Sequence, residues 1–345
     1  MNVRVICPGL QGLPGLDLGS VPPTPALDRL LIRARAGEAK HRDPLATLAE
    51  AFGLSAPPGG DLPSAALCLL AEAPDLAAQG CWFHADPVHL RPDRDRLLLF
   101  GGPSLALTGE EADALVAAFN AHFVADGLEL VAVRPDRWYL RAQTVPDILT
   151  QPLYQVSSRP IQSWAAAGPG ARDWNRWQNE AQMLFAGHPV NQKREAMGRA
   201  SIGGVWTWGG GVLPRVTRAP ALIVSDHPLA VGLARATGVP VLRPGDLMRQ
   251  PSAWPEPSPP SALVFWDGLW WPAIGVDARA WSAALGDLEA LVVRLSAGVA
   301  AGRIRALVLD DGEGWRFTLT PWGLRRFWRR GGGLRARLRD APCGQ

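Results

Sequence analysis

The pattern of hydrophobic and polar positions in the first 80 residues predicts one buried strand followed by helices. A β-branched run at 3–7 is closed by the turn signal Pro8-Gly9. Thr24 and Pro25 are typical of a helix cap and a first helical position. Apolar residues at helical spacing then predict helices, at 24–35, 44–53 and 64–72.

The middle of the chain has a different character. An amphipathic segment at 108–126 begins with a capping signal and predicts a long helix. Short apolar runs predict strands around it, at 95–100, 128–133 and 137–142. This combination predicts a compact α+β domain over 81–155, inserted between two stretches of another domain.

After residue 155 the pattern returns to strands that alternate with helices. The helix predicted at 170–187 gathers apolar residues on one face, namely Trp174, Trp177, Ala181, Leu184 and Phe185. Further helices are predicted at 228–237 and 277–298, and strands at 203–208, 221–226, 239–242, 261–268 and 304–311. The proline-rich stretch 251–260 predicts a surface loop. Such alternation favours an α/β fold, a mostly parallel sheet covered by helices on both faces and built from residues 1–80 and 156–345.

Composition narrows the class of protein. The chain has 345 residues, 47% of them hydrophobic, and a formal net charge of +3, so it suffices for two globular domains. Almost all basic residues are Arg, because the only lysines are Lys40 and Lys193. The four cysteines form no CxxC motif, and no run of about 18 apolar residues occurs. We expect a cytoplasmic protein with no membrane partner, and nucleic acid is not favoured as a partner.

Residues 188–211 (HPVNQKREAMGRASIGGVWTWGGG) place polar side chains beside a run of glycines. One interpretation is a tight turn at Pro189, followed by glycines that allow close backbone approach. The other is a polar cluster of His188, Asn191 and Arg194, suited to a phosphate or a carboxylate.

Two other stretches contain histidine. In Ser225-Asp226-His227 we expect Ser225 or Asp226 to cap the next helix, with a metal-binding pair as the alternative. In 84–89 (HADPVH), Pro87 interrupts any regular period, which favours a surface turn or a polar pocket wall. No histidine follows His227, so the carboxylates of the last third have no nitrogen ligand near them in sequence.

The C-terminal stretch 321–340 interleaves Arg with Trp and Phe. This pattern is found where proteins stack bases, and more often in a terminal helix with one basic face. We expect a protein partner here in preference to nucleic acid.

Residues 182–211 resemble the archaeal-type cofactor-independent phosphoglycerate mutases of the alkaline phosphatase superfamily, which share the order HPVN, Arg, Gly and W-x-W-G-x-G. Residues 22–34, 137–142 and 151–161 are similar to further segments of that family. The chain also resembles bacterial proteins described as phosphoglycerate mutase-like or as RpfE-type regulatory proteins. The resemblance implies an alkaline phosphatase-like core with an inserted domain.

The metal-binding residues that the resemblance implies are not found. The Asp-Gly after the first strand of the mutases corresponds to Pro8-Gly9. Their last Asp-His corresponds to Asp310-Asp311, and 266–277 (WDGLWWPAIGVD) lacks the histidine of the matching segment. The nearest counterpart of their phosphorylated serine is Ser64. From these departures we expect no metal ligands and no cofactor in this chain.

Two functions follow from this. The first is a non-catalytic, regulatory protein that binds a phosphorylated or carboxylate small molecule, or a partner. The second is an active metal-dependent mutase or phosphotransferase with Ser64 as its nucleophile. For either, we expect His188, Asn191, Arg194, Gly209 and Gly211 to line a concave site near the carboxyl ends of the central strands.

Overall fold

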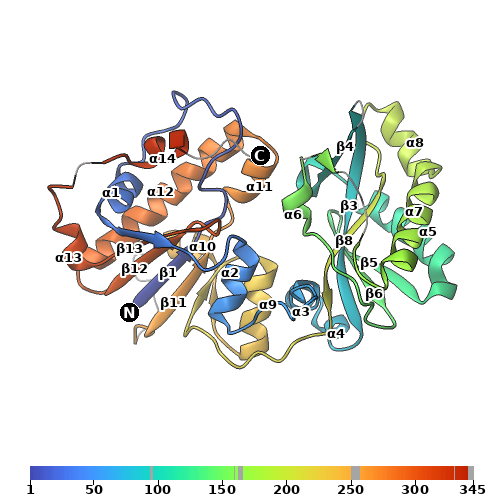
Figure 1. Cartoon of the computed structure of the whole chain (residues 1–345), viewed down its shortest axis with the longest axis horizontal. Helices are drawn as coiled ribbons and strands as arrows, with labels where there is room; N and C mark the ends of the chain where they lie inside the picture. Colours follow the sequence, from blue (N-terminus) through green and yellow to red (C-terminus); the bar gives the residue numbers. More distant parts are fainter. Residues whose placement is uncertain (94–95, 159, 162–165, 250–256, 330, 341–345) are drawn as a thin grey trace. The chain divides into compact units, whose positions relative to one another are not determined.

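The computed structural model describes the chain except for residues 94–95, 159, 162–165, 250–256, 330 and 341–345 (Figure 1). The chain divides into two compact units. The first combines residues 1–54 with residues 216–345, and the second is the continuous stretch 55–215.

The first unit is built on a seven-stranded sheet of order β10-β9-β11-β1-β12-β13-β2. Its strands are β1 (Asn2–Ile6), β2 (Arg35–Glu38), β9 (Ile223–Val224), β10 (Val241–Leu242), β11 (Ser261–Phe265), β12 (Ala306–Asp310) and β13 (Trp315–Leu319). β1 is central and pairs in parallel with β11 and β12. β9 also pairs in parallel with β10 and β11. Only β13 runs antiparallel to its neighbours, β12 and β2, so the described sheet is mostly parallel.

Helices lie on both sides of this sheet (Figure 1). α1 (Pro25–Arg33) and α12 (Ala278–Ala300) pack together over the face that carries Val3, Val5 and Leu309. α2 (Pro44–Ala51) and α9 (Pro228–Thr237) contact each other and the strands β1 and β9. The remaining helices are short: α10 (Pro244–Arg249), α11 (Trp270–Ile274), α13 (Pro321–Leu324) and α14 (Leu334–Asp340).

The second unit contains a six-stranded sheet in which β8 pairs with β3 outside the order β5-β6-β3-β4-β7. Its strands are β3 (Cys81–Asp93), β4 (Arg96–Gly101), β5 (Leu128–Arg134), β6 (Arg137–Ala142), β7 (Pro160–Ile161) and β8 (Gly204–Gly211). Every pairing in it is antiparallel.

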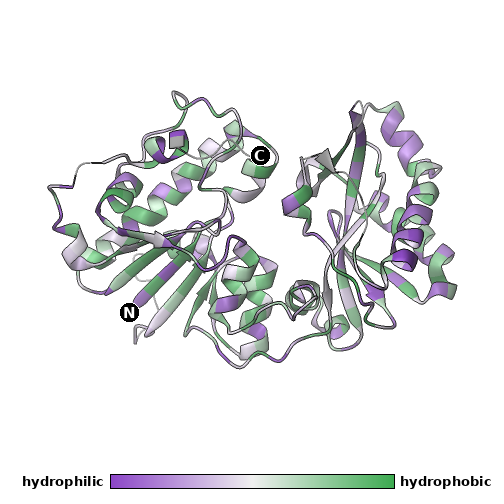
Figure 2. Cartoon of the chain, in the orientation of Figure 1, coloured by the Kyte–Doolittle hydropathy of each residue, from purple (hydrophilic) through white to green (hydrophobic). Residues whose placement is uncertain are grey.

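The helices of the second unit are α3 (Ser64–Glu72), α4 (Pro74–Ala77), η1 (Gly102–Leu105), α5 (Gly109–Phe123), η2 (Val124–Asp126), α6 (Leu153–Val156), α7 (Ala171–Ala186) and α8 (Pro189–Ala196). α5 and α7 share a hydrophobic core with Trp138 and Leu140 of β6. Tyr139, between them in the strand, hydrogen-bonds to Glu72 of α3 instead. α3 therefore lies on the opposite face of the sheet. Figure 2 shows that hydrophilic residues lie along α5, α7 and α8.

The second unit is wider than the predicted domain 81–155. α3 packs against β3 and β8, and α7 supplies Trp174, Trp177 and Phe185 to the core on the other face of the sheet. Both flanks of the predicted domain therefore belong to this unit, because their apolar faces are buried in it. Among the helices in the described ranges, none has the length and apolar character needed to cross a bilayer.

Candidate functional site

The stretch at 188–211 begins with a helix, which corrects the interpretation of Pro189 as a turn. α8 starts at Pro189, and His188 is its cap, with Nδ1 accepting a hydrogen bond from the backbone N–H of Val190 at 3.2 Å. Proline suits the first helical position because no intrahelical partner awaits its missing N–H. Partial burial lowers the pKa of His188. His188 thus shapes the start of a helix.

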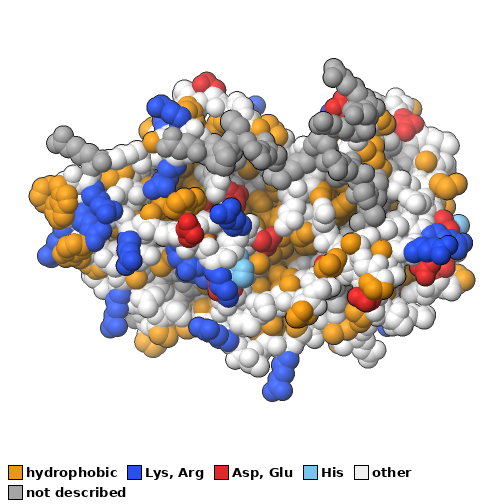
Figure 3. All heavy atoms as spheres, in the orientation of Figure 1, with side chains coloured by type: hydrophobic (Ala, Val, Ile, Leu, Met, Phe, Trp, Pro, Cys, Tyr) orange, Lys and Arg blue, Asp and Glu red, His pale blue; other side chains and the backbone are white. Residues whose placement is uncertain are grey.

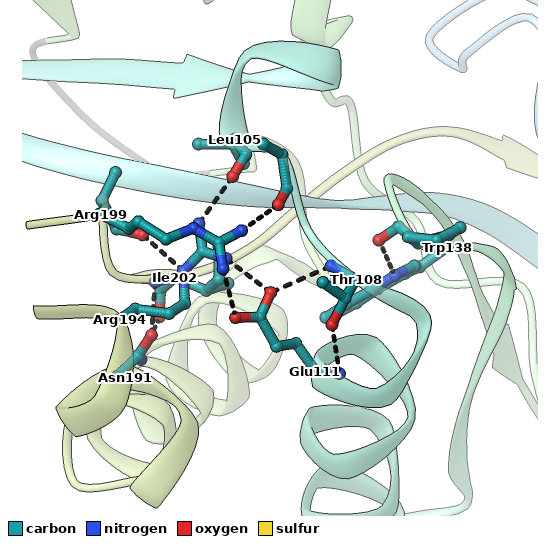
Figure 4. Close-up of polar contacts among 11 residues, drawn as sticks. Leu105, Thr108, Glu111, Trp138, Asn191, Arg194, Arg199 and Ile202 are labelled. Atoms are coloured by element: carbon teal, nitrogen blue, oxygen red, sulfur yellow. Dashed lines mark hydrogen bonds and ion pairs between the residues drawn. The ribbon is translucent and has the colours of Figure 1, made fainter. Parts of the chain in front are cut away.

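Asn191 is a buried tie between two backbone segments (Figure 4). Its Nδ2 donates to the carbonyl of Phe185 at 2.7 Å and to that of Ile202 at 2.8 Å, while its Oδ1 accepts from the N–H of Ile202 at 2.7 Å. Both amide hydrogens are used inside the protein. Asn191 therefore fixes the end of α7 to the segment that leads into β8.

Arg194 is 1% exposed, and each of its guanidinium nitrogens has a protein acceptor (Figure 4). Nε donates to the carbonyl of Ala200 at 2.7 Å, Nη2 to the carbonyl of Leu105 at 2.6 Å, and Nη1 to Glu111 at 2.7 Å. A guanidinium in this state has no exposed edge to offer to an anion. In this structure Arg194 holds protein groups, and these contacts give no support to the expectation that it binds a phosphate or a carboxylate.

Glu111 connects this cluster to the start of α5. Its carboxylate accepts from Arg194, from Arg199 at 3.0 Å and from the backbone N–H of Thr108 at 3.0 Å in a capping box. Burial alone would raise the pKa of Glu111, but the Thr108 hydrogen bond and the two guanidinium charges lower it below its usual value. His188, Asn191 and Arg194 all belong to the second unit, whereas the parallel strands belong to the first. Their predicted location near the ends of those strands stays a prediction.

The glycines at the end of β8 lie against α3 and the residues just before it. A Cβ on Gly209 would lie 2.3 Å from Ser64 Oγ and 3.2 Å from His84 Cδ2, and one on Gly211 would lie 2.8 Å from Pro63. The close backbone approach predicted for these glycines exists. It serves helix packing, however, and the groups approached are protein atoms rather than a pocket for a ligand.

Ser64, Gly209 and His84 thus meet at one point, although the sequence separates them widely. Ser64 and His84 are 1% and 4% exposed. Next to them, Thr150 Oγ1 hydrogen-bonds to Asp61 and accepts from the N–H of Gly209 at 3.3 Å. The structure therefore brings the candidate nucleophile beside a histidine, in a place closed to solvent.

Residues 84–89 lie within the long strand β3, which corrects the prediction of a surface turn. His84 stacks on Trp208 with ring centroids 3.9 Å apart, and Trp208 Nε1 donates to Asp86 Oδ2 at 2.7 Å. Burial raises the pKa of Asp86 to about 7, although the Trp208 hydrogen bond opposes the shift. His89 lies near the other end of the strand, where Nδ1 is 2.8 Å from the carbonyl oxygen of Ser201.

At the carboxyl edge of the parallel sheet in the first unit, Asp310 is fully buried between two arginines. Its Oδ2 lies 2.8 Å from Arg4 Nη2 and 3.1 Å from Arg316 Nε, and its Oδ1 accepts from the N–H of Gly312 at 3.0 Å. Both oxygens are therefore occupied by protein donors.

The neighbouring Asp311 organises the loop between β12 and β13. Oδ1 accepts from the N–H groups of Glu313 and Trp315, both at 2.8 Å, and Oδ2 accepts from Gln11 Nε2 at 3.0 Å. Burial raises the pKa of Asp311 despite these hydrogen bonds. Glu313 in turn accepts from the N–H of Gly9 at 3.2 Å, which joins this loop to the one after β1.

In the Ser225-Asp226-His227 segment the helix cap is His227, not Ser225 or Asp226. His227 Nδ1 accepts from the N–H of Leu229 at 3.2 Å, at the start of α9. Ser225 Oγ donates to the carbonyl of Phe265 at 2.9 Å. Asp226 is exposed, and partial desolvation raises its pKa.

A two-metal site of the kind that the resemblance implies needs several carboxylates and histidines with free lone pairs. Asp310 and Asp311 use theirs for arginines, an amide and backbone N–H groups, and His227 uses Nδ1 to cap a helix. Across the described ranges, no three His, Cys, Asp or Glu side chains form a group that could hold a metal ion. The residues present do not fit such a metal pair.

A cavity of about 550 Å³ opens elsewhere in the second unit, where β3 and β5 begin and β6 ends. It is lined by Asn120, Glu129, Arg141 and Gln143, together with small and apolar residues. None of the residues expected to bind a ligand lines it.

Comparison with known proteins identifies the fold. No protein-family model and no curated protein matches the chain. The PH0037 protein from Pyrococcus horikoshii is similar in structure, with 16% sequence identity, a TM-score of 0.52, and coverage of 92% of this chain and 87% of that one. The chain shares the fold of this protein. At such identity, the likeness is limited to the fold.

A cofactor-independent phosphoglycerate mutase from Thermoplasma acidophilum DSM 1728 is also similar. Its identity is 15% and its TM-score 0.44, with 97% of this chain and 94% of that chain covered.

Proposed function

We propose that the chain is a phosphoglycerate mutase-like protein that has lost the metal site of that group and acts by binding, in a regulatory role. The resemblance of residues 182–211 to the mutases supports the first part. The contacts of Asp310 and Asp311 at the carboxyl edge of the first unit's sheet support the loss of the metal site. At that edge the acidic side chains are structural groups of the loops.

The observation that carries this proposal is the state of Asp310 and Asp311. Asp310 is 0% exposed and held by Arg4 and Arg316. Asp311 accepts three hydrogen bonds from Gln11 and the backbone. A metal ion would have to displace these donors and leave two arginines beside it without their carboxylate, which is electrostatically costly.

The alternative, an active phosphotransferase with Ser64 as nucleophile, receives less support. A serine nucleophile needs a base or a metal to activate it and a path for the substrate. His84 lies beside Ser64, but both side chains are buried and Gly209 packs directly over Ser64. Transfer of a phosphoryl group to Ser64 would require β8 to move away from α3.

The class of ligand is inferred from the hydrogen bonds and ion pairs that the candidate side chains already make within the protein. Arg194 and Asn191 are occupied by protein groups, so they provide no anchor for a phosphorylated or carboxylate small molecule. At the edge of the first unit's sheet, Arg4 and Arg316 are paired with Asp310, so they too provide no such anchor. The binding function that we propose therefore involves a macromolecule or an extended surface rather than a phosphorylated or carboxylate small molecule.

Metal analysis of the purified full-length chain tests this proposal. After incubation with manganese and zinc followed by dialysis, we expect far less than one metal ion per chain. We also expect no conversion of 3-phosphoglycerate with either metal added. One or two retained metal ions, together with turnover that Ser64→Ala abolishes, would establish the enzymatic alternative instead.

A further inference from the structure

Three large aromatic side chains stand out from the surface after β13. Trp322 is 60% exposed, Phe327 78% and Trp328 59%. We call these three residues the aromatic knob. Aromatic side chains of this size are usually buried, and several exposed ones close together in sequence are typical of a contact surface.

Arginines surround the aromatic knob. Residues 321–339 contain seven arginines and neither Asp nor Glu. The guanidinium of Arg326 lies 4.2 Å above the ring of Trp322, and Arg325 and Arg329 are exposed. In Figure 3, hydrophobic and basic side chains adjoin at the end of the first unit where Figure 1 labels α13. The surface is thus both apolar and positively charged.

The backbone of the knob is held firmly by the rest of the first unit. Arg33 Nη1 donates to the carbonyl of Leu324 at 2.7 Å, and Arg329 Nη1 donates to the carbonyl of Ala34 at 3.0 Å. Thr320 caps α13 by accepting from the N–H of Gly323 at 3.2 Å. The aromatic side chains are therefore presented by a segment that is already held in place. Little backbone conformational entropy is lost when they contact a partner.

We propose that the aromatic knob and its arginines bind the surface of an anionic lipid bilayer. Trp and Phe rings enter the boundary between headgroups and acyl chains, and Arg side chains are attracted to anionic headgroups. Neither interaction requires a spanning helix. The proposal departs from the expectations, drawn from the sequence, of no membrane partner and of a protein partner at 321–340. The inference goes beyond the proposed function and holds whether or not the chain turns over a substrate.

The ring geometry favours lipid over single-stranded nucleic acid. Bases bind to aromatic side chains by stacking on free ring faces. In this structure Arg326 covers one face of Trp322, and Phe327 and Trp328 contact each other edge to face with centroids 5.3 Å apart. Insertion into a bilayer needs apolar bulk rather than free faces, so these contacts do not hinder it.

The charge pattern favours lipid over a specific protein partner. Complementary protein interfaces match a positive patch with a negative patch in a fixed register. Residues 321–339 supply only the positive sign. A uniformly anionic surface matches such a pattern without any register.

The test is sedimentation of the full-length chain with vesicles, with tryptophan emission as a second readout. We expect binding to vesicles of phosphatidylcholine mixed with phosphatidylglycerol, a shift of emission to shorter wavelength, and little binding to pure phosphatidylcholine. Binding should weaken at high salt. The triple variant Trp322→Ser, Phe327→Ser, Trp328→Ser should bind roughly tenfold less or weaker still.

A matched control removes exposed apolar side chains elsewhere. Met183 and Met197 are 77% and 71% exposed in the second unit, so Met183→Ser with Met197→Ser should bind vesicles like the natural sequence. The proposal is overturned if anionic vesicles do not bind, or if the triple variant binds equally well. Tighter binding to oligo-dT than to vesicles, or a dimer that the triple variant dissociates, would also overturn it in favour of another occupant.

Discussion

Arg194 Nη1 and Glu111 Oε2 lie 2.7 Å apart, although 83 positions separate the two residues in the sequence. The pair joins α8 to the start of α5, and Arg194 also holds the carbonyls of Leu105 and Ala200. A residue that looks like an anion-binding arginine in the sequence is thus the tie between two helices.

Substitution of Arg194 tests this role. Arg194→Met leaves one buried and one part-buried carbonyl without this donor and removes the buried partner of the Glu111 ion pair, which should lower the free energy of unfolding by roughly 2–4 kcal/mol. Calorimetry of the full chain should show a lower melting temperature for the second unit. The control Arg199→Met, whose side chain is 31% exposed, should cost about 1 kcal/mol or less. An unchanged melting temperature combined with lost affinity for 3-phosphoglycerate would restore the anion-binding interpretation.

Gly209 and Ser64 provide a test of the packing between β8 and α3. Gly209 has φ +62°, and a Cβ there would lie 2.3 Å from Ser64 Oγ, so Gly209→Ala should destabilise the chain by about 2 kcal/mol or more. Adding Ser64→Gly removes the clashing atom and should recover part of the loss. The double-mutant cycle compares the melting temperatures of the four proteins. Strict additivity of the two changes would contradict the contact.

The buried carboxyl of Asp86 predicts a pH dependence of stability. Its folded pKa is raised to about 7, above the unfolded value, so the folded state retains a proton that the unfolded state loses. The contribution of Asp86 to stability is therefore lost as the pH rises from about 4 to about 7, by roughly 4 kcal/mol in total. Asp86→Asn keeps an acceptor for Trp208 and should remove this slope.

Denaturant unfolding of both proteins between pH 5 and pH 8 measures the difference, which should grow in favour of Asp86→Asn as the pH rises. Asp113→Asn, at an exposed position of α5, should follow the natural sequence. Parallel curves for the natural sequence and Asp86→Asn would contradict the shifted pKa.

Substitution of Asp310 tests whether this residue is a structural carboxylate or a metal ligand. Asp310→Asn removes the charge that faces Arg4 and Arg316 and should lower stability by roughly 3 kcal/mol. The manganese content after loading should be equally low in both proteins. Stoichiometric manganese in the natural sequence that disappears in the variant would instead identify Asp310 as a ligand.

The elements with strong local signals were predictable from sequence. The helix at 108–126 was expected from its capping residue, and the structure places the Thr108–Glu111 capping box at its start. Strands β1, β5, β6 and β11 coincide with apolar runs. β2 was not predicted, because it is an exposed edge strand of sequence RAGE without any hydrophobic period.

Two prolines misled the prediction. Pro87 was expected to break a strand, yet it lies in the interval 85–87 where β3 pairs with β8 alone, so fewer ladder bonds there depend on an amide hydrogen. Pro189 was interpreted as a turn, although proline at a first helical position had correctly indicated α1. The same signal could have found α8.

The candidate site was less predictable than the fold, because its meaning depends on distant partners. Whether Arg194 binds a ligand or the protein is decided by Glu111 and Leu105, which no local pattern connects to it. The meeting of Ser64 with Gly209 likewise depends on how α3 packs on β8. The predicted loop at 251–260 lies mostly outside the described residues.

The position of β1 has a consequence for how the chain is made. β1 is completed first during synthesis, yet its two neighbours are β11, with Asn2 facing Ser261, and β12, with Asn2 facing Ala306. The whole second unit leaves the ribosome before either neighbour exists, and it can form its contacts while β1 waits. The nascent chain therefore carries an unpaired hydrophobic strand for most of its translation, so chaperones that hold such strands should matter more for this protein than its modest size suggests.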